Sequence, residues 1–262
     1  MVLLLGIMGC LISTNKNSNL HFDRIIKDTF KPFATSPLPE KLVPDLLARF
    51  SSSEGYRLYP DVMPLFDAIR ESKRSQTNFP SPWPWDLTVV GVVTNSDDRV
   101  PSILSSLGLN VGPRLISGSS EKASRTNTND DVSFTVLSYD VGMEKPDVSM
   151  FDAASALLRA TLFDRGHPTS PNNSKDEASV LDGFTFLHIG DDVKKDVVGA
   201  KEAGWNSLLL DRDGHYAQYF RNGEDISEQP VTLDVGDGDS DIQSVHVIRD
   251  LRALQSWIPF RS

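Results

Sequence analysis

Three apolar runs of the chain are each followed by polar side chains that could act together. The runs cover residues 87–93, 134–139 and 184–189, and each has the length and composition of a buried β-strand. The polar residues behind them are, in chain order, Thr94, Asn95, Lys145, Asp191, Asp192 and Asp196. Because ligands of an open parallel sheet bind beyond the carboxyl ends of its strands, we expect these side chains to meet at one edge.

The types of these side chains suit one chemistry. A hydroxyl and backbone amides can bind an anionic oxygen, a lysine neutralises negative charge, and clustered carboxylates hold a hard cation such as Mg2+. Taken singly, each residue has a simpler explanation: Asp192 is a good helix cap, Lys145 would face solvent, and Thr94 would end a strand. Their combination in this order predicts a site that handles phosphate with Mg2+.

The elements that must position these residues alternate between strand and helix. Apolar periodicity predicts helices over 99–107, 147–161 and 193–203, with strands over 87–93, 134–139, 184–189 and 207–210. Such alternation is typical of a parallel sheet covered by helices. The sequence therefore predicts an α/β fold.

Further elements are expected at both ends of the chain. Helical spacing predicts short helices within residues 20–50 and a helix in YPDVMPLFDAIRESKR at 59–74. The apolar run at 1–12 is read as a buried strand. A polar stretch covers 221–241, within which VGDGDSD at 235–241 is expected to be a solvated acidic loop, and a last amphipathic segment covers 247–258.

Composition excludes several classes of protein. The 262 residues carry a net charge of −10, so we expect no nucleic-acid partner. The single cysteine, Cys10, cannot form an internal disulfide, which favours the cytoplasm or the nucleus. The apolar run at 1–12 is shorter than the ~20 residues of a membrane-spanning helix, so we expect no membrane partner. The oligomeric state is not readable from the sequence.

Three segments, VVTNSDD, EKPDVSMFDAA and HIGDDVKKDVVGAKEAGW, resemble in order and spacing motifs two to four of the haloacid dehalogenase (HAD)-like hydrolase superfamily. The resemblance covers roughly residues 55–215. It implies a Rossmann-like, three-layer parallel sheet with a small, abbreviated helical cap. The domain boundaries expected from it are a core at 1–14 and 56–262, a cap remnant at 15–55, and polar surface inserts at 117–131 and 165–179.

The resemblance also implies a role for each candidate residue. Thr94 would hold the transferring phosphoryl group, and Asn95 would assist it. Lys145 would steady the nucleophile and its charge. Mg2+ would be anchored by Asp191 together with Asp192 or Asp196.

Motif one departs from the family pattern. The best match, VLLLGIMGCL, puts Gly6 at the position of the nucleophilic aspartate and Met8 at the second aspartate position, with Cys10 in place of a threonine. Glycine has no side chain that could attack phosphorus or carbon. We therefore expect no aspartyl intermediate in the chain as written, either because motif one has degenerated or because the true beginning of the chain was lost.

Two functions follow from these observations. One is a Mg2+-dependent hydrolase of the phosphatase type that acts on a small phosphorylated or otherwise anionic metabolite. As written, the chain would be inactive because it lacks the nucleophile. The alternative is a non-catalytic binding module, a pseudoenzyme that retains the anion and Mg2+ sites. Dehalogenation, which in relatives needs no Mg2+, is a further enzymatic option that the acid cluster at 191–196 disfavours.

Overall fold

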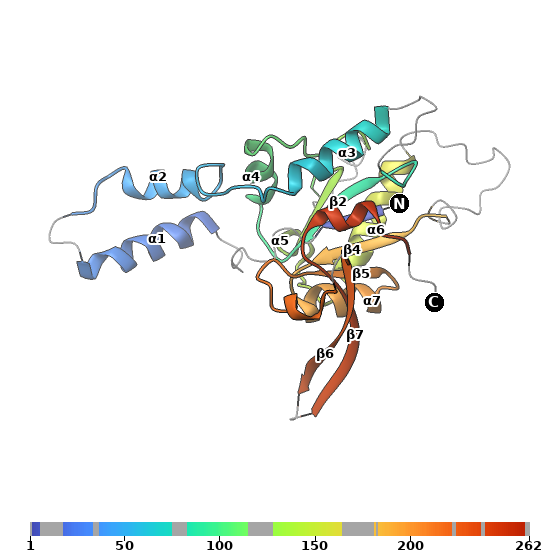
Figure 1. The fold of residues 1–262 in the computed structure, drawn as a ribbon. Helices are drawn as coiled ribbons and strands as arrows, with labels where there is room; N and C mark the ends of the chain where they lie inside the picture. The colour runs from blue at the N-terminus through green and yellow to red at the C-terminus, as the bar shows by residue number, and fades with distance from the viewer. Residues whose placement is uncertain are drawn as a thin grey trace.

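The computed structural model describes residues 2–5, 18–33, 37–74, 83–114, 128–163, 181, 183–221, 224–236 and 239–259, and Figure 1 shows their arrangement. For residues 2–5, 18–23, 163, 232–236 and 239–243 only the backbone is described. Three positions of motif one, Gly6, Met8 and Cys10, lie outside the described residues. The insert predicted at 165–179 and residues 117–127 of the other insert also lie outside them.

The described strands form one seven-stranded sheet with the order β3-β2-β1-β4-β5-β7-β6. They are β1 (Val2–Leu5), β2 (Val89–Thr94), β3 (Phe134–Leu137), β4 (Phe186–Gly190), β5 (Asn206–Leu210), β6 (Ile226–Gly236) and β7 (Asp239–Ile248). Neighbouring strands are parallel except for the antiparallel pair β6 and β7. The predicted parallel α/β sheet is confirmed, and β1 lies in it between β2 and β4.

The register brings the carboxyl ends of four strands to one edge of the sheet. Leu5, the last residue of β1, pairs with Val92 on β2 and with Ile189 on β4. Thr94, which ends β2, pairs with Leu137, which ends β3. The residues that follow these strands therefore emerge side by side, as a parallel arrangement requires.

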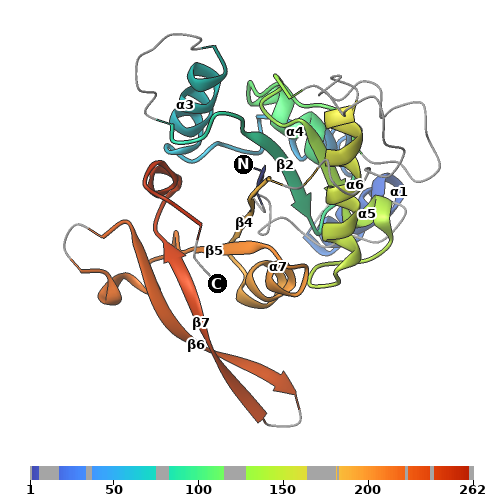
Figure 2. The same ribbon diagram turned by 90° about the vertical axis from the view of Figure 1, so that its right-hand side faces the viewer.

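The helices cover both faces of the sheet, which makes the fold three-layered. They are α3 (Val62–Arg74), α4 (Val100–Ser106), α5 (Ser138–Val141), α6 (Ser149–Phe163) and α7 (Gly199–Glu202), with shorter turns η4 (Val193–Val198), η5 (Ala217–Tyr219) and η6 (Leu251–Gln255). Figure 2 shows α3 and α6 on opposite sides of β2. The three layers expected from the sequence are thus present.

The pleat of β2 divides the core between these two faces. Val90 and Val92 pack into a cluster with α3, α4 and η6, whereas Val89 and Val93 pack into a second cluster with α6. All four valines are fully buried. A strand buried on both faces reads as a continuous apolar run, which is why LTVVGVV was recognisable in the sequence.

The helices at the start of the chain lie apart from the sheet. α1 (Ser18–Phe30), the turn η1 (Lys31–Phe33) and α2 (Leu42–Arg49) project to one side, with α1 and α2 next to each other (Figure 1). The expectation of short helices within 20–50 is confirmed. The boundaries of a cap at 15–55 stay a prediction.

The C-terminal part of the chain differs from the expectation. The polar stretch at 221–241 contains β6 and the start of β7, so residues 235–236 and 239–241 of the expected loop belong to strands. The amphipathic segment expected at 247–258 begins with the end of β7. The two strands form a long hairpin that projects from the sheet (Figure 1). Pro230 lies in β6, the edge strand of the sheet, where a missing N–H group is tolerated.

Two other elements end or begin differently from the prediction. The strand expected over 134–139 stops at Leu137, because residues 138–141 turn into α5. The helix expected over 193–203 begins as a wider π-helical turn at 193–198 before α7. Among the described residues, no helix combines the length and apolar character needed to cross a bilayer.

Candidate active site

Lys145 is the buried centre of the candidate site. It lies in the loop between α5 and α6, and its side chain is only 2% exposed. Its ammonium Nζ donates to the carbonyl oxygen of Val93 at 2.9 Å and to Oδ1 of Asp196 at 2.6 Å. A buried lysine needs an anionic partner to remain charged, and Asp196 supplies it. Lys145 and Asp196, predicted separately from two sequence segments, therefore lie in direct contact.

Asn95 fixes the backbone of Lys145. Its side-chain amide Nδ2 donates to the carbonyl oxygen of Lys145 at 3.0 Å, and its Oδ1 accepts from the backbone N–H of Lys145 at 2.7 Å. This pair of hydrogen bonds joins the loop after β2 to the loop before α6. In the structure, Asn95 thus positions the lysine through its main chain.

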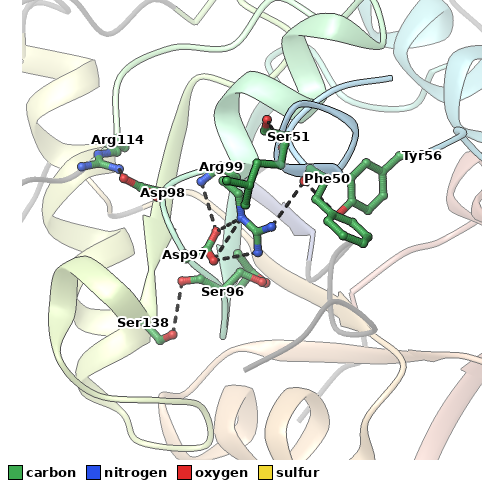
Figure 3. A network of polar contacts seen from close by, with 11 residues as sticks. Phe50, Ser51, Tyr56, Ser96, Asp97, Asp98, Arg99, Arg114 and Ser138 are labelled. Atoms are coloured by element: carbon green, nitrogen blue, oxygen red, sulfur yellow. Dashed lines mark hydrogen bonds and ion pairs between the residues drawn. The ribbon is translucent and has the colours of Figure 1, made fainter. Parts of the chain in front are cut away.

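Thr94 is fully buried at the end of β2. Its hydroxyl donates to Oγ of Ser96 at 3.1 Å. The carbonyl of Ser96 in turn accepts hydrogen bonds from Ser138 Oγ at 3.4 Å and from the N–H of Tyr139 at 3.3 Å. The turn that carries Thr94 is therefore tied to the start of α5, as the contact between Ser96 and Ser138 in Figure 3 shows.

The same turn contacts the segment that follows α2. Arg99 binds the carboxylate of Asp97, with Nε to Oδ1 at 2.9 Å and Nη2 to Oδ2 at 2.8 Å. Its Nη1 also donates to the carbonyl oxygen of Phe50 at 3.5 Å, and the hydroxyl of Tyr56 donates to that oxygen at 3.1 Å (Figure 3). The helices at the start of the chain are thereby connected to the loop beside Thr94.

Asp196 is engaged on both of its carboxylate oxygens. Besides Lys145, Oδ1 contacts Nε2 of His188 at 2.9 Å, and Oδ2 accepts from the N–H of Asp192 at 3.0 Å. Burial opposes ionisation of Asp196. The hydrogen bond from His188 and the charge of Lys145 outweigh it and hold the pKa of the Asp196 carboxyl well below its usual range. Asp196 is therefore a buried anion.

Asp192 caps the turn that begins at Val193. Its Oδ1 accepts from the backbone N–H of Lys195 at 2.9 Å, which is the arrangement of an N-cap residue. Its other oxygen, Oδ2, lies 3.6 Å from the ammonium of Lys195. The capping role that the sequence offered as a simple explanation of Asp192 is present in the structure.

Asp191 is exposed directly after β4, and it lines a pocket of about 330 Å3. The pocket has an apolar floor from β4 and β5, and its rim combines acidic, aromatic and cationic side chains. The polar and aromatic residues around it are Tyr59, Asp191, Asp211, Arg212, Asp213, His215 and Tyr216. Of the six candidate residues, Asp191 is the one that lines this pocket.

Gly190 forms the part of the pocket wall that backs onto Asp196. A Cβ atom on Gly190 would lie 2.1 Å from Cγ of Asp196, so a larger residue does not fit there without movement. Asp196, with Lys145 bound to it, therefore lies directly behind the wall of the pocket that Asp191 lines. The absence of a side chain at Gly190 is what permits this close approach.

The carboxylates of the site differ in how well they could bind Mg2+. Among the described residues, no group of three or more His, Cys, Asp or Glu side chains is placed to hold a metal ion. The carboxylates of Asp192 and Asp196 accept hydrogen bonds from protein donors, and Asp191 lines the pocket. The expectation that Asp192 and Asp196 bind Mg2+ stays a prediction, and Asp191 is the candidate whose position suits it.

Two features of the site were missed or misread from the sequence. The first is His188, which is fully buried in β4 and bonds to Asp196. An ionisable side chain in a strand buried on both faces, two residues before Gly190, was the signal that could have identified it. The second feature is an ion pair beside the pocket, in which Arg212 binds both oxygens of Asp61 and stacks on Tyr59.

Comparisons with known proteins place these residues in a family context. A family model described as HAD-hydrolase-like matches residues 142–232, which include Lys145 and Asp191. An uncharacterized protein of Saccharomyces cerevisiae is 27% identical over 191 residues, covering 70% of this chain and 48% of its own length. A protein of Schizosaccharomyces pombe, whose name describes it as an uncharacterized hydrolase, is 25% identical over 185 residues, covering 71% of this chain and 60% of its own.

This chain therefore spans about half to three-fifths of the length of these curated relatives. Among solved structures, it is similar to a HAD phosphatase from Thermococcus onnurineus, with 18% sequence identity and a TM-score of 0.43. That alignment covers 88% of this chain and 68% of the other.

Proposed function

The chain belongs to the HAD-like hydrolase superfamily, and on that premise we propose that its buried lysine site binds the phosphoryl group of a small phosphorylated metabolite. The site is of the phosphatase type, with Mg2+ as its cofactor. Gly6 stands where the attacking carboxylate would be, so the chain binds its ligand without forming an aspartyl intermediate.

The observation that carries this proposal is the fixed ammonium of Lys145. An ammonium group has three N–H donors, and the described residues engage two of them, through Val93 and Asp196. The third is left for an anionic ligand. Because the group is held at the carboxyl edge of the sheet by protein contacts, it needs no reorganisation when a phosphoryl oxygen arrives.

Asp191 is the residue that would hold Mg2+. This ion usually keeps several waters and is bound through one or two carboxylates plus the substrate phosphate, so a single exposed carboxylate beside a pocket fits it. Bound there, Mg2+ would supply positive charge to the phosphoryl oxygens.

Residues around Lys145 keep its position rather than touch the ligand. Asn95 holds the backbone of the lysine, and Thr94 is held by Ser96 at the end of β2. Neither side chain is free of protein partners, so their support of the site is through geometry. Phosphate recognition then depends on Lys145, on Asp191 with its cation, and on backbone amides of the edge.

Binding of inorganic phosphate by the unmodified chain tests the proposal. We expect calorimetric titration to show binding that strengthens with Mg2+, and Asp191→Asn to abolish that effect of Mg2+. Asp213→Asn is the matched control, because Asp213 lines the same pocket but its side chain is 85% exposed. Equal Mg2+ dependence in both variants, or no phosphate binding by the unmodified chain, would overturn the proposal.

A further inference from the structure

His188 lies at the centre of the sheet. It is in β4, where it pairs with Leu4 of β1 and with Ser207 of β5. Its ring is fully buried and packs edge-on against Phe151 of α6, with 5.2 Å between the ring centroids. A polar ring at this depth requires a hydrogen-bonding partner, and Asp196 is the partner it has.

The hydrogen-bonding pattern determines which ring nitrogen carries the proton. Oδ1 of Asp196 is the atom that Nε2 of His188 contacts at 2.9 Å, and an ionised carboxylate can only accept. Nε2 must therefore be protonated. Nδ1 is buried without a hydrogen-bond partner among the described residues, which suits a bare lone pair. Burial and the charge of Lys145 outweigh the hydrogen bond with Asp196 and lower the pKa of His188, in agreement with the single N–H that the hydrogen bonds assign.

Two donors therefore share one oxygen of Asp196. The N–H of His188 and the ammonium of Lys145 both approach Oδ1, while the N–H of Asp192 occupies Oδ2. With three donors on two oxygens and the wall of Gly190 in contact, the carboxylate has little freedom to rotate. His188 supplies the one side-chain contact that comes from the sheet itself, and the strand is the most rigid element at this position.

We propose that His188 is a positioning residue, whose Nε2–H holds Asp196 in the orientation that fixes the ammonium of Lys145 in its buried contact. In this arrangement Asp196 is the counter-ion of the lysine and not a ligand of Mg2+. The part of the inference that concerns ligand binding rests on the proposed function. The part that concerns the orientation of Lys145 does not.

The experiment compares three variants with the unmodified chain. His188→Leu removes the donor and keeps an apolar side chain of similar size, whereas His188→Gln retains an amide N–H near the position of Nε2. Phe151→Leu is the matched control, because it removes the ring that packs on His188 and leaves the contact with Asp196 in place. Each variant is first checked for cooperative unfolding, so that only folded protein is compared.

The first measurement is the rate at which acetic anhydride acetylates Lys145, followed by mass spectrometry and normalised to the exposed Lys194. We expect protection of Lys145 in the unmodified chain, in His188→Gln and in Phe151→Leu, and acetylation about 10-fold faster or more in His188→Leu, since the loss of a charge-assisted hydrogen bond is worth about a factor of ten or more. Equal protection in His188→Leu, or equal loss of protection in Phe151→Leu, would overturn the inference.

The second and third measurements separate the two proposals. Long-range nitrogen NMR of the unmodified chain should show His188 as the neutral tautomer protonated at Nε2, and protonation at Nδ1 would contradict the inference. Phosphate affinity should fall in His188→Leu and be restored in His188→Gln. If the unmodified chain binds no phosphate, the proposed function fails, whereas the acetylation rates and the tautomer still decide the role of His188.

Discussion

At the scale of single residues, an ion pair and a neutral histidine lie buried together, away from water. Lys145 and Asp196 are each at most 3% exposed, and the third member, His188, is fully buried. Removing one partner of a buried ion pair typically costs about 3 to 5 kcal/mol, because the other charge is left without compensation. Such a group is retained where its geometry is used, and we assign that use to the orientation of Lys145.

The close contact between Gly190 and Asp196 gives a prediction at this scale. Gly190→Ala places a methyl group about where the Asp196 carboxylate lies, and overpacking of this kind costs about 1 to 3 kcal/mol. We expect the free energy of unfolding, measured in urea, to fall by that amount. The displaced carboxylate should also expose Lys145 to acetylation.

Ser207→Ala on the neighbouring strand is the control for that substitution. Ser207 is buried, and its hydroxyl has no hydrogen-bond partner in the described part of the chain, so its loss removes an unsatisfied group without adding atoms. We expect its free energy of unfolding to change by less than about 0.5 kcal/mol. A loss in Ser207→Ala as large as that in Gly190→Ala would contradict the explanation by close contact.

Much of the site was readable at the residue scale, and the unreadable part has a physical cause. The order and type of Thr94, Lys145 and Asp191 were sufficient to predict that they follow strands at one edge of a parallel sheet, whereas anion binding there stays a prediction. The sequence could not tell which carboxylate of 191–196 turns inward. That choice depends on the π-helical turn after Asp192, which places Asp196 beneath Gly190, and no spacing rule predicts such a turn.

At the scale of elements, an ion pair between Arg70 and Asp131 connects α3 to the segment before β3. Asp131 accepts hydrogen bonds from Nε of Arg70 at 2.7 Å and from Nη2 at 2.6 Å, and also from the N–H of Asn110 at 2.8 Å. Burial raises the pKa of Asp131, but these hydrogen bonds outweigh it and leave the pKa below its usual range. The pair thus joins three segments that are distant in the sequence.

This pair predicts a pH dependence of stability. Because the pKa of Asp131 is lower in the folded than in the unfolded chain, its contribution is present above pH about 4 and is lost as the pH falls through the folded pKa. At pH 7 we expect Asp131→Asn to lower the free energy of unfolding by about 1.5 to 3 kcal/mol. Below pH about 4 the difference between variant and unmodified chain should shrink.

Urea denaturation of both proteins at several pH values measures this effect. Arg252→Ala provides the comparison, since Arg252 pairs with Asp250 but its side chain is 72% exposed. Exposed ion pairs contribute little, so we expect no measurable change in the free energy of unfolding at any pH. A pH-independent loss in Asp131→Asn would show that packing, and not charge, fastens α3.

The elements that the sequence predicted well are those whose burial is simple. β2 lies between two helical layers and therefore has a continuous apolar run, and the apolar positions of α3 recur at helical spacing. The hairpin of β6 and β7 was missed because its strands carry Asp, Glu, Ser and Pro residues that are common in loops. The segment forms strands because β6 and β7 pair with each other. The residue pattern of one strand alone does not show such pairing.

At the scale of the whole molecule, the topology makes one short strand indispensable and one long hairpin peripheral. β1 pairs along its whole length with both β2 and β4, so it joins the two halves of the sheet. The hairpin is attached differently, because β5 pairs with β7 only at Val247 and Ile248. The outer part of the hairpin pairs only with itself.

Two deletions test this difference. Removal of residues 1–5 should abolish cooperative thermal unfolding, because β2 and β4 lose their shared neighbour in the middle of the sheet. Replacement of residues 234–240 by Asn-Gly, a sequence that suits a two-residue hairpin turn, should shift Tm by less than about 4 °C. Circular dichroism during heating measures both, and a cooperative transition in the first deletion would contradict the central role of β1.

The most direct measurement of the central claim is hydrolysis of p-nitrophenyl phosphate in the presence of Mg2+. A site whose attacking carboxylate is replaced by Gly6 predicts only background turnover by the unmodified chain, turnover by Gly6→Asp, and its loss in Gly6→Asp combined with Asp191→Ala. We expect a gain of about 100-fold over the unmodified chain, equivalent to about 2.7 kcal/mol of barrier. Turnover by the unmodified chain that Asp191→Ala abolishes, or a folded Gly6→Asp variant that binds phosphate and remains silent, would contradict the claim.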